Sequence, residues 1–79
     1  MHLVYILKSV NHNRHYIGCT KSLSKRLKLH NDKKVRSTKA FAPWEVVYKE
    51  RFEIKSEAFK REKEIKSYKG GNAFISLLQ

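Results

Sequence analysis

A carboxylate interrupts the apolar face of a helical segment in the last third of the chain. Ala58, Phe59, Glu62 and Ile65 fall on one face of that segment, with Lys66 at its margin. Burying an unpaired, ionised carboxylate costs several kcal/mol, so Glu62 must be paired, bound to a metal or placed at the rim of a cleft. The spacing alone favours an ion pair with a nearby Lys or Arg.

A guanidinium and an imidazole share the apolar stripe of an earlier helical segment. Leu23, Arg26, Leu27 and His30 stand at positions i, i+3, i+4 and i+7. The planar fork of Arg suits phosphate, and His can bind a ligand or move a proton near neutral pH. It is equally open that Arg26 lays its methylene stem over the stripe while His30 stays solvated near the end of the helix.

Two tyrosines on neighbouring extended segments, Tyr5 and Tyr16, add phenol groups. A phenol near a cation or a metal can act as an acid, a base or an orienting donor, although a tyrosine is more often a core residue. Gly18 leaves the backbone beside Tyr16 open to close approach by another group. Together the two phenols, the guanidinium, the imidazole and the carboxylate form an incomplete set for metal-assisted hydrolysis.

Three strands and three helices are expected to position these side chains. Residues 3–8 are rich in β-branched and aromatic side chains, as in a strand buried on both faces, and a short polar turn predicts a hairpin with the next strand. The predicted order is a strand over 3–8, a strand over 14–18, a helix from the cap Ser22 to about Asn31, a loop over 32–42, a strand over 45–52, a helix from the cap Ser56 to Gly70-Gly71, and a helix over 73–78 capped by Asn72.

The third strand alternates, with Val46, Tyr48 and Phe52 expected on one face. A sheet face and an amphipathic helix can each be buried only against another layer. The expected fold class is therefore α/β in the broad sense (α+β): a small three-stranded antiparallel sheet flanked by helices, in the order β-β-α-β-α-α, as a single domain over residues 1–79.

Length and composition narrow the class of protein. The chain has 79 residues, a formal charge of +11 and 41% hydrophobic residues, so it is too short for two cores and too apolar for a disordered basic tail. The apolar runs are too short to span a bilayer, and the N-terminal residues do not read as a signal peptide. We therefore expect the protein to be located in the cytoplasm. The single Cys19 excludes an internal disulfide, and the scattered histidines do not match a structural zinc site.

A basic segment predicts a surface that binds a polyanion. Phosphate contacts give affinity that falls with salt and carry no sequence information, whereas the alternative is a solvated loop. Trp44 can stack on a base or belong to the core. The basic residues between positions 21 and 39 are Lys21, Lys25, Arg26, Lys28, Lys33, Lys34, Arg36 and Lys39, against Asp32 alone. Around the second helix, Lys60, Arg61, Lys63, Lys66 and Lys69 add further positive charge.

These separated motifs resemble the GIY-YIG endonuclease family, and the resemblance covers nearly the whole chain. It is strongest to the small single-domain bacterial members, which are related to the N-terminal nuclease module of the UvrC subunit of excinuclease ABC and to Slx-type nucleases. The motifs are Val4-Tyr5, then Tyr16-Ile17-Gly18 eleven positions after Tyr5, then Leu23-x-x-Arg26-Leu27-x-x-His30-Asn31, and finally Ala58-x-x-x-Glu62.

The resemblance implies a metal-dependent endonuclease that hydrolyses DNA, with a role in repair or recombination. Tyr5 and Tyr16 would be the motif tyrosines, Arg26 the phosphate-binding arginine, His30 its neighbour one turn later, and Glu62 the only carboxylate ligand of Mg²⁺ or Mn²⁺. Either tyrosine would take the proton from the attacking water, assisted by His30. A nearby metal or cation would have to lower the pKa of that tyrosine.

Two features of the sequence depart from the family pattern, and a third agrees with it. Leu3-Val4-Tyr5 replaces the usual Gly-Ile-Tyr, and Cys19 stands where some members carry Lys, so we interpret Cys19 as a packing residue. Asn72 falls where members often carry Asn, although a helix cap already explains it.

Two other classes of function remain open from the residues alone. One is a basic module that binds DNA or RNA and cuts neither, and the other is an adaptor for acidic proteins. The sequence carries no second DNA-binding domain, so a partner protein or a homodimer is a further possibility for targeting. For the nuclease, we expect the five candidate side chains to converge on one concave, positive surface.

Overall fold

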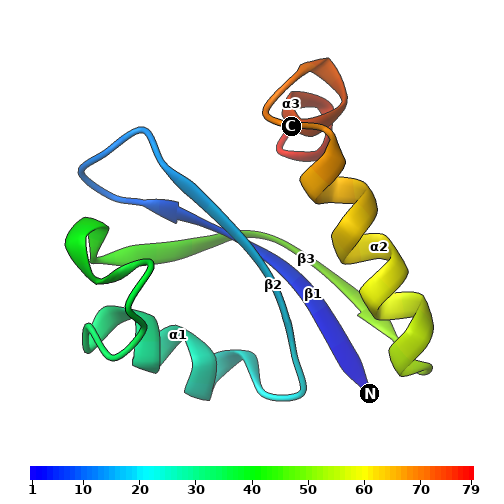
Figure 1. The fold of residues 1–79 in the computed structure, drawn as a ribbon, viewed down its shortest axis with the longest axis horizontal. Coiled ribbons are helices and arrows are strands. Elements are labelled where there is room, and N and C mark those ends of the chain that lie inside the picture. The colour runs from blue at the N-terminus through cyan, green and yellow to red at the C-terminus, as the bar shows by residue number, and fades with distance from the viewer.

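The computed structural model describes residues 1–79, and the predicted order of strands and helices is confirmed (Figure 1). Its strand order is β2-β1-β3, with both pairs antiparallel. The elements are β1 (His2–Ser9), β2 (His15–Thr20), α1 (Leu23–Asn31), a short 3₁₀ helix η1 (Lys39–Phe41), β3 (Trp44–Phe52), α2 (Lys55–Ser67) and α3 (Asn72–Leu77). No helix is long and apolar enough to cross a membrane.

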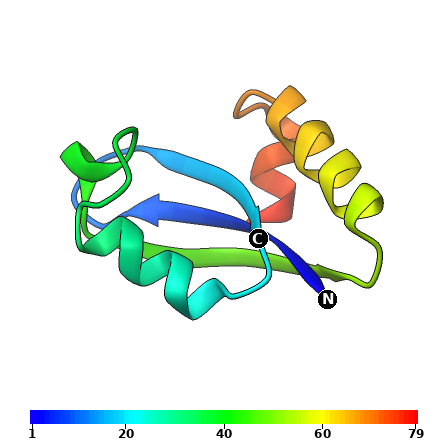
Figure 2. The same ribbon diagram turned by 60° about the horizontal axis from the view of Figure 1, so that its bottom comes forward.

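The central strand β1 is buried on both faces, as its composition predicts. Val4 and Ile6 point to one face and join a cluster with Ala58, Ile65 and Phe74 from α2 and α3. Alternate residues of a strand point to opposite faces, so one short segment supplies both cores. Figures 1 and 2 show the consequence: α2 and α3 cover one face of the sheet, and α1 lies against the other.

The second face of β1 carries a smaller cluster. Tyr5 and Leu7 pack with Trp44 there, and the apolar residues of α1, Leu23 and Leu27, close over them. Trp44 is 4% exposed, and its indole N–H donates to the carbonyl oxygen of Thr38 at 3.0 Å. Of the two interpretations of this tryptophan, the core position is the one observed.

A β-bulge corrects the predicted alternation of β3. Ile6 pairs with Tyr48 while its neighbour Leu7 pairs with Val46, so Val47 is an extra residue in β3. An extra residue reverses the inside–outside pattern on one side of the bulge. Val46 therefore packs in the α1 cluster, whereas Tyr48 packs in the α2 cluster. The prediction that both side chains share one face is wrong.

Of the three predicted N-caps, one is confirmed and two are wrong. Ser22 is the N-cap residue of α1, but its side chain makes no capping bond. α2 begins at Lys55 after Ile54, so Ser56 is inside the helix, and Gly71 rather than Asn72 is the N-cap residue of α3. A sequence pattern locates a helix better than its first residue, because the entering backbone sets the cap.

Candidate functional site

The phenol of Tyr5 lies over the backbone of Gly18, which pairs with it across β1 and β2. A Cβ atom added to Gly18 would lie 2.6 Å from the Tyr5 hydroxyl oxygen and 3.0 Å from the ring of Tyr16. Carbon and oxygen atoms that are not bonded do not approach so closely, so only glycine leaves room for the phenol here. The expected close approach of another group at Gly18 is confirmed, and that group is Tyr5.

Four of the five predicted site residues lie together between β1, β2 and α1. The ring centroids of Tyr16 and His30 are 4.7 Å apart, and the Tyr5 ring lies 6.2 Å from that of Tyr16 and 6.3 Å from that of His30. Arg26 lies one helical turn before His30 on α1. Its guanidinium is near both phenols, and both tyrosines raise the pKa of Arg26. The antiparallel pairing of β1 with β2 brings the tyrosines together, and the helical stripe brings the cation and the imidazole to them.

His30 is completely buried and is held through both ring nitrogens. Its Nδ1 lies 2.8 Å from the Thr38 hydroxyl, and its Nε2 lies 3.4 Å from the Tyr5 hydroxyl. Because the Thr38 hydroxyl donates to the Val35 carbonyl oxygen, it can accept from a protonated Nδ1. This tautomer leaves the lone pair of Nε2 facing Tyr5, whose hydroxyl then donates to it.

The electrostatics of this cluster keep its buried groups neutral. Burial lowers the pKa of His30, and the positive charge of Arg26 lowers it further. Burial raises the pKa of Tyr5, and the neighbouring Arg26 offsets only part of that change. Arg26 thus acts on Tyr5 in the expected direction, but desolvation of the phenolate is the larger effect, so the pKa is raised overall.

Arg26 carries the one buried side-chain nitrogen or oxygen atom without a hydrogen bond. Its Nε has no partner in the protein. An unsatisfied buried donor costs about 1–3 kcal/mol, so a ligand that brings a hydrogen-bond acceptor to Nε would remove this cost. A phosphate oxygen is such an acceptor, and guanidinium groups bind phosphate through two nitrogens at once.

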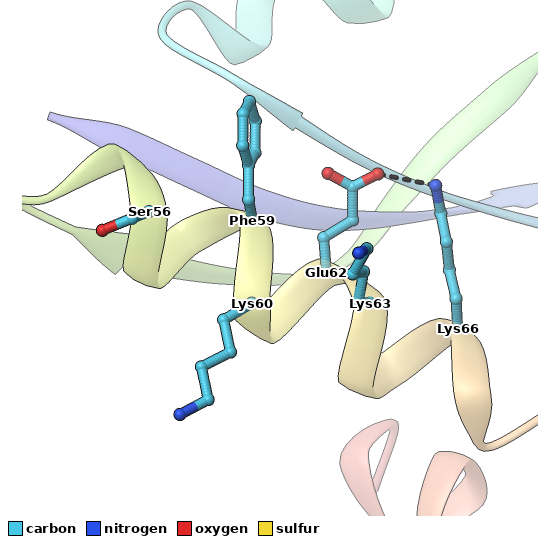
Figure 3. Close-up of a pocket in the computed structure, with 6 residues that line it drawn as sticks. All are labelled: Ser56, Phe59, Lys60, Glu62, Lys63 and Lys66. Atoms are coloured by element: carbon cyan, nitrogen blue, oxygen red, sulfur yellow. Dashed lines mark hydrogen bonds and ion pairs between the residues drawn. The ribbon is translucent and has the colours of Figure 1, made fainter.

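Glu62 comes from α2, which packs on the opposite face of the sheet. Its side chain is 19% exposed, and its Oε2 accepts a bond of 2.6 Å from the ammonium group of Lys66, one turn later. The ion pair that the spacing favours is therefore present. The carboxylate nevertheless lines an open cavity of about 600 Å³, together with Phe59, Lys63 and Lys66. Figure 3 shows these side chains along α2.

No single cavity joins all five predicted site residues. The cavity at Glu62 is lined only by residues of α2, and no cavity includes Tyr5, Tyr16, Arg26 or His30. The two groups are still electrostatically connected. Besides the larger effect of burial, the negative charge of Glu62 raises the pKa values of Tyr5 and Cys19. Helices α1 and α2 lie on different faces of the sheet, but the charge of Glu62 reaches Tyr5 and Cys19, so the convergence of all five side chains stays a prediction.

The donors near Glu62 suit a hydrated divalent ion better than a protein-enclosed one. No group of three or more His, Cys, Asp or Glu side chains could hold a metal. Oε1 of Glu62 accepts no hydrogen bond from the protein, because Lys66 occupies only Oε2. Mg²⁺ commonly takes one or two carboxylates and completes its shell with water and substrate phosphate, so a single carboxylate at an open cavity fits it.

Several side chains of α2 lie elsewhere than the helical stripe predicts. Ala58 and Ile65 are fully buried as expected, but Phe59 is 48% exposed and Lys66 is exposed as well. Arg61 does not contribute free positive charge, because it pairs with Glu50 at 3.1 Å and also with Glu64.

The predicted basic surface is mostly solvent-exposed. Of its eight residues all but Arg26 are exposed, and Lys28 is paired with Asp32 at 2.6 Å. Cys19, interpreted as a packing residue, is half-buried against the α2 cluster.

One residue of the cluster escaped the sequence analysis. Thr38 is 2% exposed and holds the buried His30, yet it stands in a segment with many charges and no periodicity. A threonine between basic residues carries no signal of burial, because only the fold shows which loop residue reaches the imidazole.

Comparisons with known proteins give one consistent result. Residues 1–72 match the family model described as the GIY-YIG catalytic domain. A UPF0213 protein of Staphylococcus epidermidis is 46% identical over 85% of this chain and 82% of its own length, and one from Staphylococcus aureus is 43% identical over the same shares. The solution NMR structure of a UPF0213 protein from Bacillus halodurans has a TM-score of 0.57 and 30% identity, covering 96% of this chain and 83% of that one.

Proposed function

We propose that this chain, which belongs to the GIY-YIG family, is a divalent-metal-dependent endonuclease that hydrolyses phosphodiester bonds in DNA. The observation that supports this most directly is Arg26, whose buried Nε lacks a partner beside two phenols and a neutral imidazole. A phosphate oxygen would satisfy that donor. We further propose that residues 1–79 act as one nuclease domain on repair or recombination intermediates.

In this proposal Glu62 would hold Mg²⁺ or Mn²⁺ through the carboxylate oxygen that Lys66 leaves free. When bound, such an ion supplies Lewis-acid polarisation of the scissile phosphate and stabilises the leaving oxygen. Lys66 can pass from its ion pair with Glu62 to a phosphate oxygen of the substrate, because its side chain is 53% exposed and long. The ammonium group of Lys66 thus lies beside the carboxylate before substrate arrives.

The remaining residues bind charge and move the proton. Arg26 binds the negative charge that develops on the phosphate. Tyr16 is half-buried and Tyr5 is 1% exposed, so Tyr16 is the phenol that the attacking water can reach. Once its own hydroxyl proton has passed to solvent, Tyr16 would take a proton from that water as the water oxygen attacks phosphorus. The bond to the leaving oxygen breaks, and a solvent water gives that oxygen its proton. Tyr5 and His30, joined by their hydrogen bond, hold the cluster in place.

The exposed basic segment is the proposed backbone-binding surface. Its charges carry no base-specific contact, so binding should depend strongly on salt and weakly on sequence. The nucleic-acid residues proposed here are Lys21, Lys25, Arg26, Lys28, Lys33, Lys34, Arg36 and Lys39.

A cleavage panel tests the function. Supercoiled, branched and single-stranded DNA, with matched RNA, would be incubated with Mg²⁺ or Mn²⁺ and the wild-type chain, Glu62→Gln, Arg26→Ala or Glu64→Gln. Glu64→Gln is the matched control, because it neutralises an acid of α2 that pairs with Arg61 outside the site. Metal-dependent cleavage that is lost in the first two variants and retained in the control supports the nuclease.

One observation favours a second candidate, a basic module that binds nucleic acid without cutting it. The ion pair of Glu62 with Lys66 gives the carboxylate a structural role that needs no metal. Salt-dependent binding with no cleavage of any substrate in the panel would select this module over the nuclease.

A further inference from the structure

We propose that Phe59 is a stacking platform for an unpaired base beside the scissile phosphate, so that the substrate is nucleic acid with an unpaired nucleotide rather than a regular duplex. This rests on the proposed function for the position of the scissile phosphate near Glu62. It adds a binding residue that the basic segment does not include, on a different element and a different face of the sheet.

The first support is the exposure of an aromatic ring in a polar cavity. Phe59 is 48% exposed, whereas Ala58 and Ile65 of the same helix are completely buried. It is also the only hydrophobic residue lining the cavity of about 600 Å³. A large aromatic ring that its own protein leaves about half exposed is available for a ligand.

The second support is the geometry along α2. Phe59 and Glu62 are three residues apart, which puts side chains of a helix on neighbouring positions about 5–6 Å apart at Cβ. Figure 3 shows the ring of Phe59 and the carboxylate of Glu62 projecting from the same side of the helix, while Lys60 projects away. A base on the ring would therefore lie within one nucleotide of a phosphate held near Glu62.

The third support is charge. Lys60, Lys63 and Lys66 line the same cavity, and the ammonium group of Lys55 lies 5.3 Å from the centroid of the Phe59 ring. An aromatic ring among ammonium groups matches a nucleotide, which has a flat π face and an anionic phosphate. An apolar peptide would match the ring and leave the lysines without partners, so a nucleotide is the better occupant.

The need for an unpaired base follows from the shape of a duplex. Base faces in a double helix are covered by their neighbours, and stacking on an outside ring requires a base that is single-stranded or flipped out. The cavity volume lies within the range of small-molecule sites, about 300–1,000 Å³, which accommodates one nucleotide.

Binding without metal tests this independently of cleavage. Fluorescence anisotropy in EDTA would give the Kd of a labelled single-stranded oligonucleotide and of a blunt duplex of equal length, for the wild type and for Phe59→Ala. Loss of one stacked base should weaken single-strand binding about tenfold. Duplex binding should change by less than about twofold, since only the phosphate contacts remain.

Three further variants separate stacking from other effects. Phe59→Tyr should retain tight single-strand binding because it keeps a ring, and Phe59→Leu should lose as much as Phe59→Ala. Ile75→Ala is the matched control, since Ile75 is also 48% exposed but lies on α3. An oligonucleotide with iododeoxyuridine should photocrosslink to Phe59 in the wild-type chain.

The following results would overturn the proposal. Equal losses on single strand and duplex, wild-type affinity in Phe59→Leu, or no change in Phe59→Ala would each show that no base stacks on this ring. The last result would assign the cavity to another class of partner, such as a protein. A wild-type chain that binds single strands through Phe59 but cuts nothing would contradict the proposed function and leave this inference standing.

Discussion

The two faces of β1 differ in what they bury. Toward α2, Val4 and Ile6 pack against apolar residues such as Ile65 and Phe74. Toward α1, Tyr5 meets a buried imidazole and a guanidinium whose Nε has no partner. One strand therefore serves two purposes by its alternation, since the apolar face contributes stability and the polar face keeps groups that only a ligand would satisfy.

The polar cluster therefore depends on the apolar face for the stability of the sheet that holds it. Hydrophobic burial stabilises the sheet by about 25 cal/mol per Å², whereas an unsatisfied buried donor costs about 1–3 kcal/mol. Helix α2 lies on the apolar face of β1 but carries both kinds of residue. It buries Ala58 and Ile65 in the core and presents Glu62 and Phe59 at an open cavity.

Removing apolar volume from the α2 face should have the largest effect on stability. Ile65→Ala should lower the free energy of unfolding by about 2–5 kcal/mol, because Ile65 is completely buried and its cavity cannot fill. Urea denaturation followed by circular dichroism measures this. Ile75→Ala on the exposed side of α3 should change it by less than about 0.5 kcal/mol. Similar losses in both variants would contradict the assignment of the core.

Arg26→Ala should remove the activity of the polar cluster on the α1 side of the sheet without unfolding the chain. We expect cleavage to fall by about 10²–10³-fold, the usual effect of removing one donor that stabilises developing charge. The free energy of unfolding should stay equal or rise, because the variant removes the unpartnered buried Nε. Single-turnover cleavage and thermal melting would be measured on the same samples. A large drop in Tm would show that Arg26 is structural.

Gly18→Ala should disturb the contact between the two tyrosine strands. The new methyl group would meet the Tyr5 hydroxyl and the Tyr16 ring, so we expect a loss of about 1–3 kcal/mol in stability. Chemical denaturation checks this. A second change, Tyr5→Leu, removes the phenol over Gly18, and part of the loss should then return. If it does not, the strain lies in the backbone of β2.

Thr38→Val tests the polar face alone, because it removes one hydrogen bond to His30 and little side-chain volume. The Nδ1 proton of His30 would lose its acceptor, which costs about 1–3 kcal/mol in a buried site. We expect kcat to fall and the pH profile of kcat to shift while KM stays near its wild-type value. Thr38→Ser keeps the hydroxyl and should restore the profile. Equal profiles in Val and Ser variants would rule out positioning through the imidazole.

The pH dependence of stability should show the smallest change. Because burial and Arg26 lower the pKa of His30 in the folded chain, the unfolded chain takes up a proton first as pH falls below the ordinary value of 6.5. Stability should therefore be complete above that pH and decline below it, down to the lowered pKa of the folded state. In His30→Gln the loss of stability at low pH should be smaller. Some loss should remain, because burial also lowers the pKa of His15. Urea midpoints across this pH window measure it.

The amino-acid pattern predicts much of the site and misses specific contacts. The helical stripe with Arg26 and His30 and the interrupting Glu62 follow from periodicity, because these spacings are local. The bulge at Val47, the partnership of Thr38 with His30 and the exposure of Phe59 do not. Each depends on which distant segment packs against the residue.

The sequence by itself determined the order of the strands and helices and the residue types that can do chemistry, since both follow from local spacing and side-chain properties. Only the tertiary structure decided that Tyr5 lies over Gly18, that Thr38 holds the buried His30, and that two faces of one sheet carry different tasks. The physical reason is that burial and hydrogen-bond partners come from contacts between segments far apart in the chain, and no local pattern contains them.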